Sequence, residues 1–310
     1  MGELTYHLPV MPEEVITGLN IRTDGLYIDA TLGGGGHASL ILEKLTTGKL
    51  LGIDRDKDAL DENKEKWENE NFTGVHGNFH ALPGILKDRG IDKIDGILID
   101  LGISSHQVDT PGRGFSYRLD GPLDMRMNQQ QGQTAADIVN TCAEKDLTRI
   151  LYQYGEERHA PRIVRSIIKA REKEPIQGTA QLVDIIESAL PAAARHGEKH
   201  PSMRTFMALR IAVNDELEPL KDTLLALPGL LNPGGRVVIL TFHSLEDRIV
   251  KHAFRHMANP CNCPRDIPFC ACGKKPAVKI ITRSPILPGE GELAINSRAK
   301  SAKLRIAEKI

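Results

Sequence analysis

The residues best suited to chemistry near the start of the chain are a glycine run and the acid that follows it. Four consecutive glycines, Gly33–Gly36, precede His37, and Asp54 closes the next apolar run. Glycines let the backbone approach a ligand closely, and the helix expected after them offers unpaired N–H groups at its start. An acid about 20 residues after such a turn suits the hydroxyl pair of a ribose. This region is therefore predicted to bind a cofactor that contains adenosine.

Two classes of cofactor fit this pattern. The run from Gly33 to Ala38 matches the dinucleotide pattern G-x-G-x-x-G/A, which leaves an NAD-dependent oxidoreductase open, although no second substrate domain with a base for the nicotinamide is evident. S-adenosylmethionine needs only a close backbone, an acid for its ribose and polar groups for its adenine. Asn78 and Phe79 follow the third apolar run, and Phe79 is predicted to lie against the adenine; the alternative is a core aromatic. Asp100 ends the fourth run, where sheets of this kind bind ligands.

A particular kind of sheet has to bring these residues together. Apolar runs alternate with helical patterns up to Ser105, which predicts a doubly wound, mainly parallel α/β sheet of the Rossmann-like type. Loop and helical patterns then take over, so residues 107–203 are predicted to be an inserted all-helical domain, with residues 1–106 and 204–310 as the two parts of the sheet domain. A long helix is predicted over Arg204–Leu227. The predicted strands are 26–28, 50–53, 72–75, 95–100, 236–241, 278–282 and 302–307, the last of them antiparallel.

Bulk composition sets the broad class. The 310 residues are 40% hydrophobic and 26% charged, as in an ordinary soluble globular protein. No apolar run approaches membrane-spanning length and the N-terminus lacks a signal pattern, so a cytoplasmic location without membrane attachment is expected. The net charge is −1, but from Lys251 onward 12 Lys/Arg face 4 Asp/Glu. Such a basic tail indicates a polyanionic partner, and a solvated basic face is the alternative.

Four of the five cysteines are clustered late in the chain. Cys261 and Cys263 form one C-x-C pair, and Cys270 and Cys272 form another. Four thiolates make a closed structural zinc site, although C-x-C is a less usual spacing than C-x-x-C. Disulfides are not expected in a reducing cytosol, and thiols without a metal are the alternative. Cys142 stands apart and is predicted to be a small core residue.

Several long signatures resemble the MraW/RsmH-type methyltransferases, which modify the N4 of a cytosine in small-subunit (16S) ribosomal RNA. The resemblance runs nearly end to end. The matching segments are His7–Val10, Asp29-Ala-Thr-Leu-Gly-Gly-Gly-Gly-His37, Gly52-Ile-Asp54-Arg-Asp56, Asp100-Leu-Gly-Ile-Ser-Ser-His-Gln107, Arg113-Gly-Phe-Ser116, Leu123-Asp-Met-Arg-Met127, Ala208–Leu217 and Phe242-His-Ser-Leu-Glu-Asp-Arg248.

This resemblance implies S-adenosylmethionine as the methyl donor and a class I methyltransferase sheet interrupted by a helical domain. It implies small-subunit ribosomal RNA or the 30S particle as the partner, in the cytoplasm. The oligomeric state stays open, a homodimer being one alternative. The implied cofactor contacts are Gly35, Gly36, His37, Asp54, Phe79, Asp100 and Gln107.

The chemistry requires an acceptor for the protons of a cytosine amine. That amine is a poor nucleophile because its lone pair is delocalised into the ring, so placement in line with the methyl group and an acceptor on its N–H groups would both help. Asp100, Ser104 and Ser105 lie in the loop where such acceptors are expected; turn capping is the alternative for the serines. His243 is a candidate proton relay, and a hydrogen-bonded structural histidine is the alternative.

Contacts to the RNA itself are expected from three further residues. Arg113 lies on a glycine-flanked loop that suits a phosphate, and a solvated arginine is the alternative. The fourth strand continues as Asp100-Leu-Gly-Ile and lacks the aromatic that many amino-group methyltransferases place there, so Phe115 or Phe242 is expected to stack on the base. The target base has to be unstacked or single-stranded. Two rival functions are a non-catalytic RNA-binding module and a methyltransferase that acts on another nucleic acid or a protein.

Overall fold

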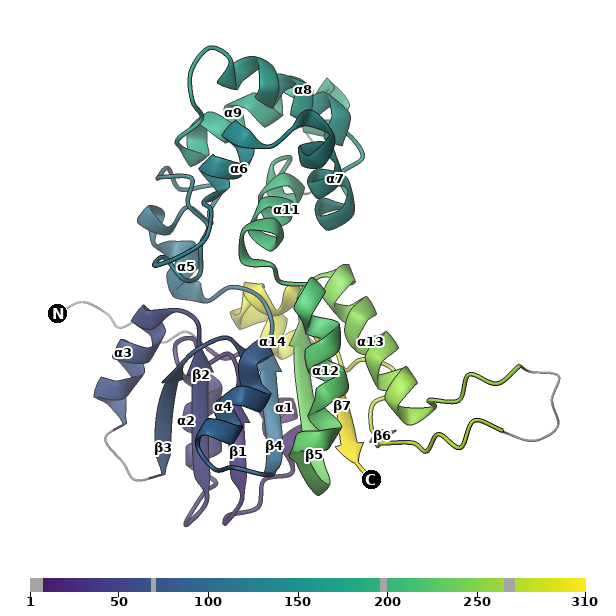
Figure 1. The fold of residues 1–310 in the computed structure, drawn as a ribbon. Helices are drawn as coiled ribbons and strands as arrows, with labels where there is room; N and C mark the ends of the chain where they lie inside the picture. The colour runs from purple at the N-terminus through teal and green to yellow at the C-terminus, as the bar shows by residue number, and fades with distance from the viewer. Residues whose placement is uncertain (1–7, 68–70, 196–199, 265–270) are drawn as a thin grey trace. The chain divides into compact units, whose positions relative to one another are not determined.

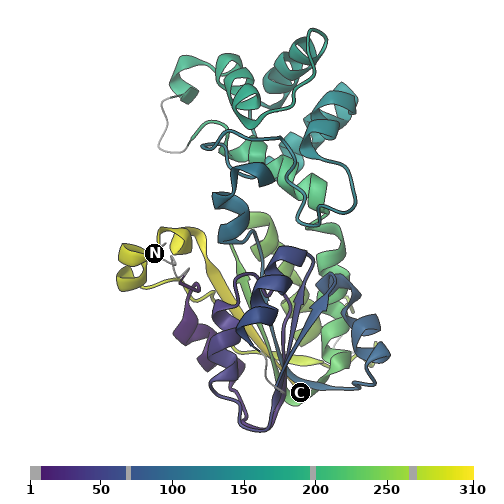
Figure 2. The ribbon, with the colours of Figure 1, turned by 90° about the vertical axis from the view of Figure 1, so that its left-hand side faces the viewer.

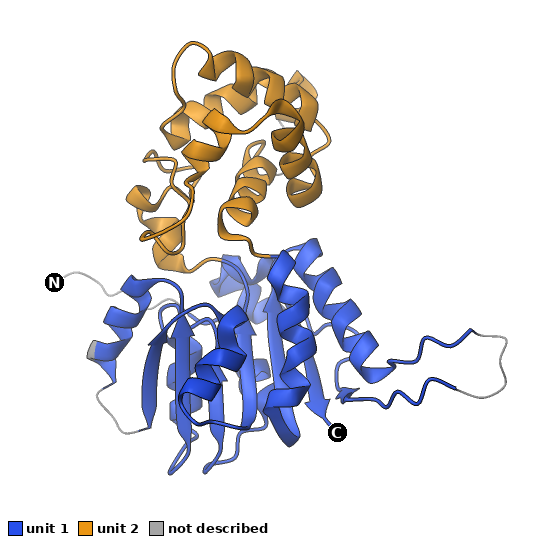
Figure 3. Ribbon diagram, in the orientation of Figure 1, with its two compact units in different colours: residues 1–102, 217–310 blue, residues 103–216 orange. Residues whose placement is uncertain are grey.

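The computed structural model describes residues 8–67, 71–195, 200–264 and 271–310, and divides them into two compact units. Unit 1 combines the first part of the chain, to Gly102, with Leu217–Ile310, and unit 2 is Ile103–Glu216 (Figure 3). The boundaries expected from the sequence are at residues 106 and 204. Each unit has a hydrophobic core of its own.

Unit 1 is built on one seven-stranded sheet in the order β3-β2-β1-β4-β5-β7-β6 (Figure 1). Its strands are β1 (Leu26–Asp29), β2 (Lys49–Asp54), β3 (Phe72–His76), β4 (Ile94–Asp100), β5 (Leu231–Thr241), β6 (Val278–Ile280) and β7 (Lys303–Lys309). Strands β1 to β5 pair in parallel, and β7 runs antiparallel to both β5 and β6. The predicted doubly wound sheet with an antiparallel end is therefore confirmed.

Alternating apolar residues of the central strands explain the three-layer packing. Leu51, Ile97 and Val237 face one core, whereas Leu50 and Leu98 face the other. Because successive side chains of a strand point to opposite faces, a strand that is apolar throughout is buried on both. Helices on the first face are α4 (Leu82–Asp88), α12 (Glu218–Leu230) and α13 (Ser244–Ala258); those on the second are α1 (Pro12–Leu19), α2 (Gly36–Leu42) and α3 (Lys57–Lys66) (Figures 1 and 2).

The start of β5 contains the turn-like segment Asn232-Pro-Gly-Gly, which lies within the strand instead of before it. The register with β4 jumps from Ile94 opposite Leu231 to Gly96 opposite Arg236, so the intervening residues bulge out of the ladder. Gly234 has φ 81° and takes up this kink.

Unit 2 is helical, as predicted, and no strand occurs among its described residues. Its core includes Leu147, Ile163, Leu182 and Leu209, one from each of four helices. The helices are α5 (Ser105–Asp109), α6 (Ala135–Thr141), α7 (Glu144–Gly155), α8 (Ala160–Arg171), α9 (Thr179–Ala189), α10 (Ala192–Arg195) and α11 (Met203–Asn214). Short 3-10 turns, η1 (Phe79–Ala81) in unit 1 and η2 (Pro111–Arg113) in unit 2, join other elements.

The prediction of one helix over Arg204–Leu227 is wrong. Helix α11 ends at Asn214, and Asp215 then adopts the left-handed conformation with φ 47°. Its N–H donates to the Ile211 carbonyl, which closes the last turn, and α12 begins at Glu218 with Pro219 in its first turn. The apolar spacing continues across this break, which is why periodicity alone suggested a single helix. No described helix has the length and apolarity needed to cross a membrane.

Candidate cofactor-binding site at the carboxyl edge of the sheet

Three acids of unit 1 lie at the carboxyl ends of neighbouring strands. Asp29 ends β1, Asp54 ends β2 and Asp100 ends β4. Strand β1 pairs in parallel with both of the others, so the three ends share one edge of the sheet. The chain leaves β1 toward β2 on one side and returns to β4 on the other, which makes this edge the topological switch point where such sheets bind ligands.

The glycine run forms a tight loop between β1 and α2. Gly33 and Gly35 have φ values of 49° and 77°, a region that residues with a side chain rarely adopt. A Cβ on Gly35 would also overlap the side chains of Asn63 and Trp67. The amide of Asn63 donates to the Gly33 carbonyl at 2.7 Å, which ties α3 to the loop. Glycine is thus required at position 35 by both conformation and space.

Asp54 fastens this loop to the second strand. Its Oδ2 accepts the Gly33 N–H at 2.8 Å, and its Oδ1 accepts the Asp56 N–H at 2.8 Å. Burial raises the pKa of Asp54, and the two N–H donors oppose that rise because they favour the carboxylate. Each carboxylate oxygen can accept more than one hydrogen bond, so both keep capacity for a ligand hydroxyl.

Buried His37 and partly buried Asp100 form a polar pair beside the loop. His37 is 6% exposed, and its Nε2 lies 3.6 Å from Asp100 Oδ2, which is longer than a hydrogen bond. Neither ring nitrogen of His37 has a hydrogen-bond partner among the described residues. The Oδ1 atom of Asp100 also has none among them. Buried polar atoms without partners are costly, and a bound ligand is one group that can supply the missing partner.

Asp29 is the third acid and was not among the predicted site residues. It is 1% exposed, and its Oδ1 accepts the Thr31 N–H at 3.2 Å. Burial raises the pKa of Asp29 to about 7, against the opposing charge of His37. Thr31 also accepts the Asp100 N–H at 2.7 Å through its hydroxyl, so one turn links both acids. The position of Asp29 at the end of the first strand was the available signal.

The residues after β3 are held in place by the core. Phe79 is 8% exposed and belongs to the cluster beneath α4 and α12, and its ring centroid lies 4.0 Å from that of His80. Asn78 accepts the His80 N–H through its side chain at 3.2 Å, so it caps η1. The His80 ring lies 3.0 Å from the Thr223 hydroxyl, and burial lowers the pKa of His80 to about 4. The contact of Phe79 with adenine stays a prediction.

Two of the predicted residues in unit 2 cap a helix. Ser104 Oγ accepts the Gln107 N–H at 3.2 Å, and Gln107 Oε1 accepts the Ser104 N–H at 3.1 Å. This reciprocal pair begins α5, and Ser105 is the first residue of that helix. The alternative interpretation of Ser104 as a turn cap therefore describes its contacts.

Arg113 and Phe115 are buried inside unit 2. Arg113 is 4% exposed and donates from Nη2 to the carbonyls of Arg126 and Met127, at 3.1 and 2.9 Å. Phe115 is 6% exposed and belongs to the helical core. These contacts give both residues structural roles in the loop before α6, and neither is proposed to contact the RNA.

His243 and Phe242 precede α13 in unit 1. His243 caps this helix through Nδ1, which accepts the Glu246 N–H at 3.4 Å, and its Nε2 lies 3.0 Å from Glu246 Oε1. Glu246 in turn accepts the Phe242 N–H at 2.9 Å, and Phe242 packs against the second core of unit 1. The three-residue spacing of His243 and Glu246 is that of a capping box, a signal present in the sequence.

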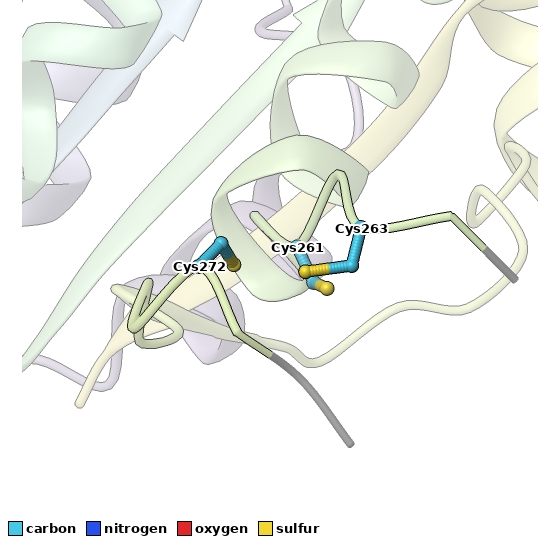
Figure 4. Close-up of side chains that lie close together, drawn as sticks. All are labelled: Cys261, Cys263 and Cys272. Atoms are coloured by element: carbon cyan, nitrogen blue, oxygen red, sulfur yellow. The ribbon is translucent and has the colours of Figure 1, made fainter. Parts of the chain in front are cut away.

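Three of the four clustered cysteines come together in unit 1. The Sγ atoms of Cys261, Cys263 and Cys272 all lie within 4.8 Å of one another (Figure 4). Cys270 lies outside the described residues. Cys142 is partly buried against the core of unit 2.

The fold and the site together define a class of protein. A sheet ordered 3-2-1-4-5-7-6 with a single reversed strand, a glycine loop after β1 and an acid after β2 is the arrangement of S-adenosylmethionine-dependent methyltransferases. The unpaired groups of His37 and Asp100 and the open glycine loop fit such a cofactor, which carries both charged and hydroxyl groups.

The chain belongs to the MraW methylase family, whose model matches residues 4–310. A ribosomal RNA small subunit methyltransferase H from Carboxydothermus hydrogenoformans is 51% identical over 306 residues, covering 98% of both chains. Proteins of the same name from Brevibacillus brevis and Geotalea uraniireducens are 50% and 52% identical over 308 residues, covering 98% of this chain and 98% and 99% of their own. The chain is thus a methyltransferase that uses S-adenosylmethionine.

Proposed function

We propose that this protein transfers a methyl group from S-adenosylmethionine to the exocyclic N4 of a cytosine in small-subunit (16S) ribosomal RNA. The observation that supports the proposal is the pairing of buried His37 with partly buried Asp100 beside the glycine loop. Both ring nitrogens of His37 and Oδ1 of Asp100 lack hydrogen-bond partners among the described residues. The names of the relatives at about 50% identity support small-subunit ribosomal RNA as the substrate.

The residues of the glycine loop and of β2 would hold the cofactor. Asp54 offers its carboxylate oxygens to the ribose hydroxyls while it keeps the loop in place through Gly33. Gly35 and Gly36 would contact the cofactor through their backbone, and His37 would offer its two ring nitrogens to the charged methionine end. When bound, S-adenosylmethionine would supply an electrophilic methyl group on its sulfonium sulfur. The rest of the cofactor is a good leaving group because it departs as a neutral thioether.

Asp100 is the acceptor that the structure supports best for the target amine. Its Oδ1 is buried and lacks a partner among the described residues, so it is available to accept an N–H of the cytosine amine. A carboxylate there localises the nitrogen lone pair and receives the proton that the amine loses. Ser104 and His243 are less suited because both already cap helices. Ser105 stays a prediction as a second acceptor.

The partner is proposed to be ribosomal RNA in the cytoplasm, either free or assembled in the 30S particle. An exocyclic amine in a stacked duplex is out of reach, so the cytosine has to be unstacked or unpaired. Phe242 is the remaining candidate for stacking on the base, since Phe115 lies in a core. The basic residues that follow Lys251 would add attraction for the phosphate backbone.

The test is methyl transfer to small ribosomal subunits from cells that lack this enzyme. With S-adenosylmethionine labelled in its methyl group, the wild-type protein should label the RNA, and nucleoside digestion should yield N4-methylcytidine. Asp100→Ala should abolish labelling and keep the folded far-ultraviolet spectrum. Asp88→Asn, at an exposed acid that ends α4, is the matched control and should retain full activity. Wild-type turnover in Asp100→Ala would refute the role of Asp100, and label in another nucleoside would refute the substrate.

A further inference from the structure

The segment between α13 and β6 extends away from the rest of unit 1 (Figure 1). A backbone hydrogen bond joins its two ends, in which Ala277 N–H donates to the Met257 carbonyl at 2.8 Å. Between these residues the described chain contains no further helix and no strand once α13 has ended at Ala258, and none of its described side chains is buried. Long loops without secondary structure are uncommon in a compact domain, and the described parts of this loop are not ordered by a core.

Three cysteines nevertheless converge from the two arms of this loop. Cys261 and Cys263 lie on the outgoing arm and Cys272 on the returning arm, with all three Sγ atoms within 4.8 Å of one another (Figure 4). No disulfide joins these three residues. With Zn–S bonds of about 2.3 Å, tetrahedral ligands lie about 3.8 Å apart, so only a small contraction separates this cluster from a zinc site. Because none of the described side chains of this segment is buried, hydrophobic packing does not explain why the three thiols lie together.

The described residues that follow the cluster in the chain carry positive charges. Lys274 and Lys275 follow Cys272 directly after one glycine, and both are exposed. Lys279 and Arg283 add two further positive charges, and the described residues from 259 to 289 contain no acid. The donor set of soft sulfur atoms selects zinc over magnesium or calcium.

We infer that Cys261, Cys263 and Cys272 bind a structural zinc ion that joins the two arms of the loop between α13 and β6. The ion would order this segment in place of a hydrophobic core. It is remote in function from methyl transfer, since the cluster contains none of the residues assigned to the cofactor or the target amine.

The test is the metal content and metal affinity of cysteine variants. The protein is purified without chelator, with any metal-binding tag removed, and zinc per chain is measured by plasma mass spectrometry. We expect about one zinc ion per chain. Cys261→Ser and Cys272→Ser should weaken zinc binding by at least about 10-fold, since losing even a supporting partner of a metal ligand costs that much. Cys142→Ser, at the fifth cysteine, is the matched control and should keep the wild-type affinity.

Two further measurements keep the inference separate from folding and from the methyltransferase activity. S-adenosylmethionine binding and the far-ultraviolet spectrum should be unchanged in both zinc-site variants, because none of the described side chains between Met257 and Ala277 is buried in a core. Limited proteolysis should cut the loop faster in these variants than in the control. Wild-type protein without zinc, a stoichiometric iron content in its place, or wild-type zinc affinity in Cys261→Ser would each overturn the inference.

Discussion

The sharpest single perturbation of the proposed cofactor site is Asp54→Asn, which keeps the shape of the side chain and removes its charge. In the wild type, the two carboxylate oxygens each accept a backbone N–H, from Gly33 and from Asp56, both at 2.8 Å. An asparagine has only one oxygen, so one of these N–H groups would face an NH₂ donor instead. The glycine loop would therefore lose one of its two ties, and the ribose would lose a charged acceptor.

The size of both effects follows from the contacts. Leaving one buried N–H without an acceptor should lower the free energy of unfolding by about 1–3 kcal/mol. A hydrogen bond to a charged group is worth about 1.5–3 kcal/mol, so losing one to the ribose should weaken S-adenosylmethionine binding by about 10- to 100-fold. Isothermal titration calorimetry measures the affinity, and urea unfolding followed by circular dichroism measures the stability.

The matched control for this experiment is Asp88→Asn, which removes an exposed acid at the end of α4. It should leave both the affinity and the unfolding midpoint at their wild-type values. If Asp54→Asn binds S-adenosylmethionine within about twofold of the wild type and also keeps the wild-type unfolding midpoint, the carboxylate neither holds the ribose nor fastens the loop, and the proposed geometry of the site is refuted. A normal affinity in a destabilised protein would refute the ribose contact alone.

Two further predictions concern the same edge of the sheet. Gly35→Ala should lower cofactor affinity and lower the free energy of unfolding by about 1–2 kcal/mol because of the left-handed backbone, with a further loss from the overlap with Asn63 and Trp67. Gly84→Ala, in open space on α4, is the control. Equal unfolding midpoints for the two variants would contradict the requirement for glycine at position 35. Asp29→Asn should stabilise the protein increasingly as the pH rises. The raised pKa of Asp29, about 7, means that the folded protein keeps a proton that the unfolded chain loses near pH 4, so the wild type loses about 1.4 kcal/mol of stability for each pH unit between these values. Urea unfolding from pH 4 to 8 measures this difference, and a constant gap between variant and wild type would contradict it.

Much of the fold was predictable because its signals are local. The chain from Leu26 to Asp54 contains a strand, a glycine turn, a helix and a second strand in unbroken order, and each is fixed by neighbouring residues. The break at Asp215 was not predictable in this way. The apolar spacing of α11 continues into α12, and only the left-handed residue between them shows that the chain turns.

The site was predictable in part. Positions at strand ends pointed to Asp54 and Asp100, because parallel strands bring their carboxyl ends to one edge. The same reasoning overlooked Asp29, whose burial and raised pKa arise from neighbours distant in sequence. Residue type alone did not predict the contacts in the loop of unit 2. Arg113 was expected to bind a phosphate, and in the structure its guanidinium donates to backbone carbonyls.

By itself, the sequence determined the order of the elements, the glycine turn and the acids that close the strands, because turn conformation and alternating burial depend on residues close together in the chain. The tertiary structure alone decided which polar groups are paired. His37 and Asp100 are separated by more than sixty residues, and they meet only because β1 lies between β2 and β4 in the sheet. Burial removes water from the His37 ring and from Oδ1 of Asp100 and leaves these atoms available to a ligand, which no local pattern of residues can show.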